Sequence, residues 1–325
     1  MVLNGRANEN GISRETERKV MEMAEKLHYQ PNQVARGLRL GRSYTLGLIV
    51  SDISNLFFAR IGRSIEDQAA RAGYNVIFCS SDENANKEAR LLQVLKDRQV
   101  DGIIISPTQV DRESIKKLKK EGYPFVLIDR HFPELETNYV VADNYQGAFQ
   151  AVDHLLRLGH RKIGHITVFH EQVNCMKERW RGYQDALVQH SVEPERNLVM
   201  GVQWENMRAE VYEAVKKLLH PPEGVSAIFV SNNRLTMHVF ECLQELKLKI
   251  PGEVSVVSYD DVDYFRLIYP PVTAVAQNEA EIGAEAVRIL LKAISGEAKH
   301  EQVTLPVELK VRRSCGSFLN KTYDT

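Results

Sequence analysis

Polar and aromatic side chains stand directly after several apolar runs of this chain, where a ligand could be bound. In an open sheet of parallel strands, ligands bind beyond the carboxyl ends of the strands. Carboxylates accept hydrogen bonds from hydroxyl groups, an amide both donates and accepts, and an indole covers the apolar face of a ring. The set therefore suits a neutral ligand rich in hydroxyl groups. Its members are Asp52, Asp129, Trp204, Asn232, Asp260 and Asp261.

Each of these residues also has a purely structural interpretation. A strand-end Asp or Asn commonly caps the next helix or forms a turn, and a lone Trp commonly packs in a core. Arg179, in "KERWRGY", could be a solvated charge on a helix. The case for binding rests on several such residues meeting at one cleft.

An enzyme is the main alternative from another class. The GxSxG, HExxH, GxGxxG and P-loop patterns are absent from the sequence. Paired acids across a cleft could catalyse glycoside hydrolysis, but Asp129 and Asp260 end strands of different predicted lobes. The ten histidines and four cysteines show no metal-ligand spacing. We therefore expect no catalysis, no metal and no cofactor.

Chain length and charge limit the remaining classes of protein. A chain of 325 residues fits two domains plus an appendage. The net charge of −1 gives no whole-chain argument for nucleic acid, although Arg36, Arg39 and Arg42 cluster without a nearby acid. No secretory leader and no apolar run of about 18 residues stands out, so we expect a cytoplasmic protein that does not meet a membrane.

From Tyr44 onward, short apolar runs alternate with amphipathic stretches. The runs are apolar on both faces, as parallel strands covered by helices require. We predict α/β architecture with two doubly wound units in series. The first five predicted strands span 44–51, 74–81, 101–107, 125–129 and 138–143, and the next four span 162–168, 197–203, 226–231 and 254–260.

The predicted helices fill the intervals between the strands, and the last segments return to the two units. We expect extended chain over 270–277 and 303–312, so the polypeptide crosses between the lobes more than once. Such lobes enclose a cleft that closes on a small ligand. The helices span 58–72, 86–97, 112–121, a segment ending at Gly159, a segment through Trp180 to Val188, 207–219, 234–246 and 279–294.

The front segment is different in kind. Ser13 can cap a helix whose apolar stripe (Val20, Met23, Ala24 and Leu27) needs partners elsewhere. Asn32 can then cap a short helix over 33–39, which cannot be stable alone in water. Its single Leu38, between Arg36 and Arg39, suits the minor groove of DNA. The alternative is a plain linker.

The chain resembles the lactose-repressor/galactose-repressor (LacI/GalR) family of transcription regulators from end to end. The resemblance implies a helix-turn-helix head, a hinge helix and a core of two periplasmic-binding-protein-like (type I) lobes. The family's recognition helix ends in "VLNG", which stands here at the first residues, so most of the head is expected to be missing. The matching stretches include "LHYQPNQVARGLRLGRS", "TLGLIVSDISNLFFARIGRSIEDQAARAGYNVIFCSSDE", "VDGIIISP", "LGHRKIGHI", "RWRGYQDAL" and "VSVVSYDDVDYFRLIYPPVTAVAQ".

The resemblance also implies site residues and domain limits. Effector-binding positions are Phe57, Phe58, Asp129, Arg179, Trp204, Asn232, Asp260 and Gln277, and DNA-binding positions are Asn32, Val34, Ala35, Arg36, Leu38 and Arg39. The expected domains are a head remnant (1–30), a hinge (31–43), a first lobe (44–142 and 277–304), a second lobe (143–276 and 305–317) and a tail (318–325). Leu56 and Asn233 depart from the family's usual Pro and Asp, and "TVFHEQVNCM" lacks the usual glycines.

The resemblance implies a repressor that binds operator DNA as a homodimer. A small effector, expected to be a sugar or glycoside, would bind between the lobes and control DNA affinity, and Arg179 leaves a phosphorylated or acidic sugar open. A solute-binding protein with the same core fold is the alternative. The missing leader and the hinge sequence argue against it.

Overall fold

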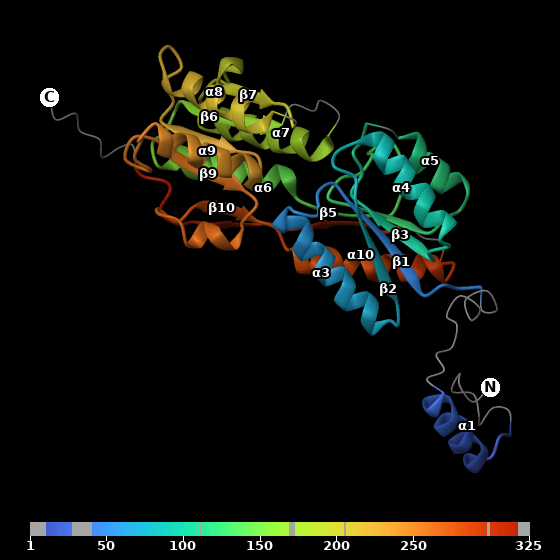
Figure 1. Cartoon of the computed structure of the whole chain (residues 1–325). Helices are drawn as coiled ribbons and strands as arrows, with labels where there is room; N and C mark the ends of the chain where they lie inside the picture. The colour runs from blue at the N-terminus through green and yellow to red at the C-terminus, as the bar shows by residue number, and fades with distance from the viewer. Residues whose placement is uncertain are drawn as a thin grey trace.

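The computed structural model describes residues 11–27, 41–110, 112–168, 173–204, 206–297 and 300–317. These residues form two α/β lobes side by side, and the helix α1 stands apart from both (Figure 1). Each lobe is built on a six-stranded sheet. The predicted class of two doubly wound lobes is confirmed.

The first lobe has the strand order β11-β5-β4-β3-β1-β2, and all of its neighbouring strands are parallel. Helices α3 and α10 cover one face of the sheet, while α4 and α5 contribute to the core on the other. The strands are β1 (Thr45–Val50), β2 (Asn75–Ser80), β3 (Gly102–Ile105), β4 (Phe125–Ile128), β5 (Tyr139–Ala142) and β11 (Gln302–Leu305). The helices are α3 (Leu56–Arg71), α4 (Ala85–Asp97), α5 (Glu113–Lys120) and α10 (Glu279–Ile294).

The second lobe repeats this order as β12-β10-β9-β8-β6-β7, and β12 alone runs antiparallel to its neighbour. Helices α6 and α7 pack on one face and α8 and α9 on the other. The strands are β6 (Ile163–Val168), β7 (Val199–Val202), β8 (Ala227–Val230), β9 (Ser255–Tyr259), β10 (Thr273–Ala276) and β12 (Glu308–Lys310). The helices are α6 (Asn144–Arg157), α7 (Asn174–Gln189), α8 (Met207–Leu219) and α9 (Asn233–Glu245), with 3-10 turns η3 (Arg196–Leu198) and η4 (Asp263–Arg266).

The central strands are buried on both faces, which explains their unbroken apolar sequences. All residues of β3, β4 and β8 are buried. Helices pack closely against one another where glycine leaves room. A Cβ built on Gly182 of α7 would lie 2.4 Å from the Tyr145 carbonyl oxygen of α6. The second lobe therefore depends on glycine at this helix crossing.

The chain passes between the lobes three times, after β5, after β10 and after β11. The predicted extended segment 303–312 is two strands in different sheets, since β11 ends at Leu305 and β12 begins at Glu308. Leu305 pairs with Ala142, so the expected lobe limit at 304/305 is wrong by one residue. Three connections of this kind constrain the lobes to move about one shared hinge.

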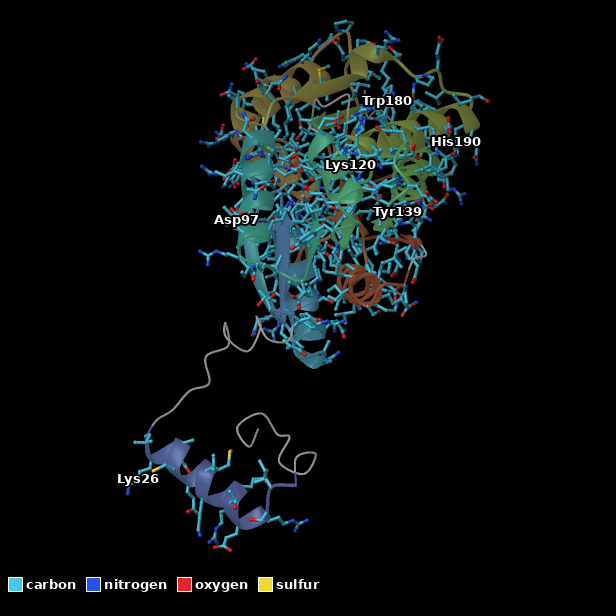
Figure 2. The ribbon with its side chains drawn as sticks, turned by 90° about the vertical axis from the view of Figure 1, so that its right-hand side faces the viewer. Lys26, Asp97, Lys120, Tyr139, Trp180 and His190 are labelled. Atoms are coloured by element: carbon cyan, nitrogen blue, oxygen red, sulfur yellow. The ribbon has the colours of Figure 1, made fainter. Side chains whose placement is uncertain are left out.

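Helix α1 (Arg14–Lys26) begins where predicted, because the Ser13 side chain accepts a hydrogen bond of 3.2 Å from the Thr16 amide. None of its residues is buried, and Met21, Met23 and Leu27 are exposed. Figure 2 places Lys26 far below the labelled residues of the two lobes, which include Asp97, Lys120, Tyr139, Trp180 and His190. Of the expected segments, 1–10, 28–40 and 318–325 lie outside the described residues.

The start of helix α3 differs from its predicted limit for a local reason. Helix α3 begins at Leu56 rather than Phe58, because the Asn55 side chain caps it by accepting from the Phe57 amide. Leu56 is thus the first helical residue, a position that also suits proline. Within the described ranges, no helix is both long and apolar enough to span a lipid bilayer.

One buried carboxyl group in the first lobe makes stability depend on pH. Glu88 of α4 is 1% exposed. Its Oε2 accepts a 2.7 Å hydrogen bond from the Thr108 amide, while Oε1 makes no hydrogen bond among the described residues. Burial, only partly offset by the Thr108 amide and Arg130, raises the pKa of Glu88 to about 7. The folded chain therefore keeps a proton that the unfolded chain releases at lower pH.

We expect Glu88→Gln to stabilise the protein at high pH. A carboxyl whose folded pKa is raised costs stability as pH rises from its unfolded pKa to its folded pKa. The variant should be about 1–3 kcal/mol more stable than wild type at pH 8 and about equal to it near pH 4.5. Denaturant unfolding across this range measures the difference, with Glu213→Gln on the exposed face of α8 as control. A difference that does not change with pH would contradict a buried titrating group.

Candidate functional site

Two aspartates occupy equivalent places in the two lobes. Asp129 follows β4 and Asp260 follows β9. Both have left-handed backbone, with φ of 64° and 67°, and both are 6% exposed. Asp tolerates this conformation better than most residues do, but two buried cases at matching strand ends indicate a functional constraint.

Both aspartates line one cavity between the lobes. The space among its lining atoms amounts to about 530 Å³, including the part that opens to solvent. The first lobe contributes Ser51, Asn55, Phe57, Phe58, Glu83, Asp129 and Arg130, and the second contributes Val168, Val173, Cys175, Met176, Arg179, Trp204, Asn232 and Asp260.

The structure brings seven of the eight predicted effector positions together on this cavity. They are Phe57, Phe58, Asp129, Arg179, Trp204, Asn232 and Asp260. The eighth, Gln277, is not among the lining residues. Its Nε2 donates a 2.7 Å hydrogen bond to Asp260 Oδ1, so it orients that carboxylate from behind. The predicted DNA-binding positions lie within 28–40, outside the described residues.

Two strand-end aspartates of the initial set do not line the cavity. Asp52 forms an ion pair with Arg234 of the other lobe. Asp261 forms a bidentate ion pair with Arg312, with distances of 2.8 and 2.6 Å. The pairing with Arg312 holds the Asp261 carboxylate away from the cavity that Asp260 lines.

Arg179 is part of the second lobe's core and not a solvated helix charge. It is 2% exposed. Its Nε donates to Asn144 Oδ1 at 2.8 Å, its Nη1 donates to the Ser231 carbonyl at 2.5 Å, and its guanidinium lies 3.6 Å from the centre of the Tyr259 ring. Arg179 therefore contributes to the core of the second lobe as well as to the cavity.

Burial and opposite charges act against each other in the cavity. Burial raises the pKa of Asp129, and the guanidiniums of Arg130 and Arg179 partly offset that rise. Burial likewise raises the pKa of Asp260, against the effect of Arg179 and of the Gln277 hydrogen bond. Burial alone would lower the pKa of Arg179, but Asp260, Tyr259, Cys175 and Asp129 together outweigh it and raise the pKa, so the guanidinium stays charged.

The sequence did not predict the ion pair between Arg130 and Glu83 at this site. Arg130 donates from both terminal nitrogens to the Glu83 carboxylate, at 2.8 and 2.7 Å, and both side chains are 8% exposed. Its Nε lies 3.3 Å from Asp129 Oδ2. Glu83 also has left-handed backbone, with φ of 54°. Reading two or three residues beyond each strand end, and not only the first, would have included both residues.

Aromatic rings close the apolar sides of the cavity. Phe57 and Phe58 pack edge to face with centroids 5.0 Å apart at the start of α3. Trp204 follows β7, and the guanidinium of Arg234 lies 5.3 Å from its ring centre. Rings placed in this way can cover the C–H faces of a sugar while the polar groups bind its hydroxyls.

Direct polar contacts join the lobes around the cavity. Asn233 Nδ2 donates to Asn55 Oδ1 at 2.9 Å. On another side, the Asn174 amide donates to Gln109 Oε1 at 2.8 Å, and Asn174 Nδ2 lies 2.8 Å from His131 Nδ1. These contacts exist only while the lobes are close together. A change in lobe orientation must therefore break them.

Similarity to known proteins agrees with this arrangement. Residues 152–315 match the model of a periplasmic binding protein-like domain. Over 315 residues the chain is 35% identical to catabolite control protein A of Priestia megaterium, covering 96% of this chain and 93% of that one.

Two solved structures with sugars are also similar. A LacI family transcriptional regulator from Enterococcus faecium with bound ribose matches with a TM-score of 0.74 and 29% identity, over 84% of this chain and 99% of that chain. The transcriptional regulator CelR in complex with cellobiose matches with a TM-score of 0.76 and 27% identity, over 96% of this chain and 94% of that chain. By this similarity along nearly its whole length, the chain belongs to the LacI/GalR family of transcription regulators.

Proposed function

We propose that this regulator binds operator DNA as a homodimer and that a sugar or glycoside between its lobes sets its DNA affinity. The observation that carries the proposal is the cavity itself. Asp129 comes from one lobe, Asp260 and Arg179 come from the other, and all three line one space. A ligand that contacts all three favours one relative orientation of the lobes, which is the differential contact that an allosteric switch requires.

The bound sugars of the related structures support the ligand class, since one holds ribose and the other cellobiose. The names of the relatives support a regulator in preference to a solute-binding protein or an enzyme. A regulator of this kind acts in the cytoplasm. The pattern of donors and acceptors in the cavity also fits binding without catalysis.

The DNA-binding part of the proposal concerns helix α1 and neighbouring segments, 1–10 and 28–40, that lie outside the described ranges. We assign Asn32, Val34, Ala35, Arg36, Leu38 and Arg39 to a hinge that contacts DNA, and 1–30 to the head. The lobes would comprise 44–142 with 277–305, and 143–276 with 306–317. A short helix that folds only on DNA would relay the spacing of the lobes to the heads.

The direct test of the proposed function is DNA binding with and without sugar. The protein selects a duplex from a random library, and its affinity for that duplex is measured by fluorescence anisotropy with and without each sugar of a panel. We expect Leu38→Ala to weaken DNA binding roughly tenfold, because an apolar wedge in the minor groove is lost, and to leave sugar affinity unchanged. Val188→Ala on the exposed end of α7 is the control. DNA affinity that no sugar alters in either direction would refute the proposal.

Exposed apolar side chains in the loop after η4 support the homodimer. Helices α3 and α10 pack together, and Arg60 of α3 forms an ion pair of 2.6 Å with Asp263 of the second lobe. The adjoining loop exposes Leu267 to 84% and Tyr269 to 90%. Large exposed apolar side chains in one place mark an interaction surface. A two-fold symmetric dimer would match a palindromic operator.

Replacing both apolar side chains, Leu267→Asp with Tyr269→Asp, should convert the dimer to a monomer, because two carboxylates would be buried without partners. Multi-angle light scattering at micromolar concentration measures the mass. Val188→Asp, at an equally apolar but separate exposed position of 61%, should remain dimeric. A wild-type protein that is monomeric or tetrameric under these conditions would overturn the assignment, as would an unchanged dimer in the double variant.

A further inference from the structure

Acidic side chains outnumber basic ones among the described residues that line the cavity. The described residues that line it include three carboxyl groups (Glu83, Asp129 and Asp260) and two guanidinium groups (Arg130 and Arg179). All are nearly buried. Even with one carboxylate protonated, positive charge is not in excess.

The two terminal nitrogens of Arg130 are already engaged by a protein carboxylate. Both of its terminal nitrogens donate to the Glu83 carboxylate at 2.8 and 2.7 Å. A forked pair of donors is what makes arginine a good partner for phosphate or carboxylate. Glu83 occupies that fork, so a ligand anion would have to displace a buried carboxylate from its partner.

The guanidinium of Arg179 is held on two of its three nitrogens. Nε binds Asn144 and Nη1 binds the Ser231 carbonyl, while the Tyr259 ring covers one face. Nη2 makes no hydrogen bond in the part of the chain that the structure describes. That leaves a donor for a ligand hydroxyl, and the charge of Arg179 is balanced by Asp260 and Asp129.

A ligand anion would meet these carboxylates at low dielectric. Like charges repel strongly when water is excluded, and the cost of removing the anion from water adds to the repulsion. A neutral hydroxyl is not repelled, and its smaller desolvation cost is offset by the hydrogen bonds it forms. It donates to a free oxygen of Asp129 or Asp260 and accepts from Arg179 or Asn232.

We propose that the cavity selects its ligand by charge, binding neutral polyhydroxylated sugars and rejecting the same sugars once they carry a phosphate or carboxylate. This inference rests on the proposed function for its ligand class. It excludes the phosphorylated or acidic sugar that Arg179 alone left open. Selection comes from two arginines whose charges are already neutralised by protein carboxylates.

The test is titration calorimetry of the full chain with matched pairs. The pairs are D-ribose with ribose 5-phosphate, D-glucose with glucose 6-phosphate and with glucuronate, and inorganic phosphate serves as the minimal anion. The neutral member should bind about a hundredfold more tightly or better, and inorganic phosphate should give no saturable heat. A charged member that binds as tightly as its neutral parent, or saturable binding of phosphate, overturns the inference.

Two neighbouring substitutions separate the charge effect from damage to the fold. Asp260→Asn keeps the shape but removes one cavity charge, so the ratio between neutral and phosphorylated sugar should fall about tenfold. Asp261→Asn changes the adjacent residue, which pairs with Arg312 away from the cavity, and should leave the ratio unchanged. An unchanged ratio in Asp260→Asn would count against charge selection.

The two proposals fail in distinguishable ways. If neutral sugars bind and charged ones do not, but DNA affinity never changes, then the proposed control of DNA binding is wrong and the proposed charge selection stands. If DNA affinity responds best to a phosphorylated sugar, the switch stands and the charge selection is wrong.

Discussion

Buried charge at the junction of the lobes is the constraint on which the rest of the structure depends. Asp129, Asp260 and Arg179 interact electrostatically with one another while nearly excluded from water. Each such charge costs several kcal/mol to desolvate, and the cost is repaid only by well-placed partners. The surrounding polar side chains supply them. Gln277 holds Asp260, Asn144 and the Ser231 carbonyl hold Arg179, and Glu83 with Arg130 supports Asp129.

The same constraint links binding to lobe movement. Arg179 and Asp129 attract each other from different lobes, so opening the cavity weakens that attraction and admits water. Direct contacts add to this coupling. Asn233 donates to Asn55 across the junction at 2.9 Å, a bond that the Asp usual in the family could not donate. The departure at position 233 therefore adds a direct link between the lobes.

Much of the fold and of the cavity could be predicted from the sequence. Parallel strands buried on both faces appear as clear apolar runs, and ligand-binding side chains lie at their carboxyl ends. Asp129, Trp204, Asn232 and Asp260 followed from that rule alone. Asp52 and Asp261 did not behave as expected, because the rule locates a strand end and does not give the direction of the side chain. Arg179 lies on a helix, where only the family resemblance identified it.

The roles of the other residues depend on tertiary contacts, which the spacing of apolar residues in the sequence does not reveal. Glu83 contacts Arg130 only because the fold brings the ends of β2 and β4 together. Gln277 contacts Asp260 only because the strands that they follow lie side by side. The exposed Leu267 and Tyr269 likewise read as part of a loop in the sequence. Their exposure becomes informative only once η4 is fixed beside α3 by the ion pair between Arg60 and Asp263.

The proposed ligand site is the cavity between the lobes, against Trp204. The chain has two tryptophans, and they differ in position. Trp204 lines the cavity, while Trp180 stacks on Tyr183 in the second lobe with centroids 5.3 Å apart. The measurement is intrinsic fluorescence during titration with a neutral sugar that binds. We predict that the ligand-dependent change persists in Trp180→Phe and disappears in Trp204→Phe. A change that persists in Trp204→Phe and disappears in Trp180→Phe would contradict the placement of the site.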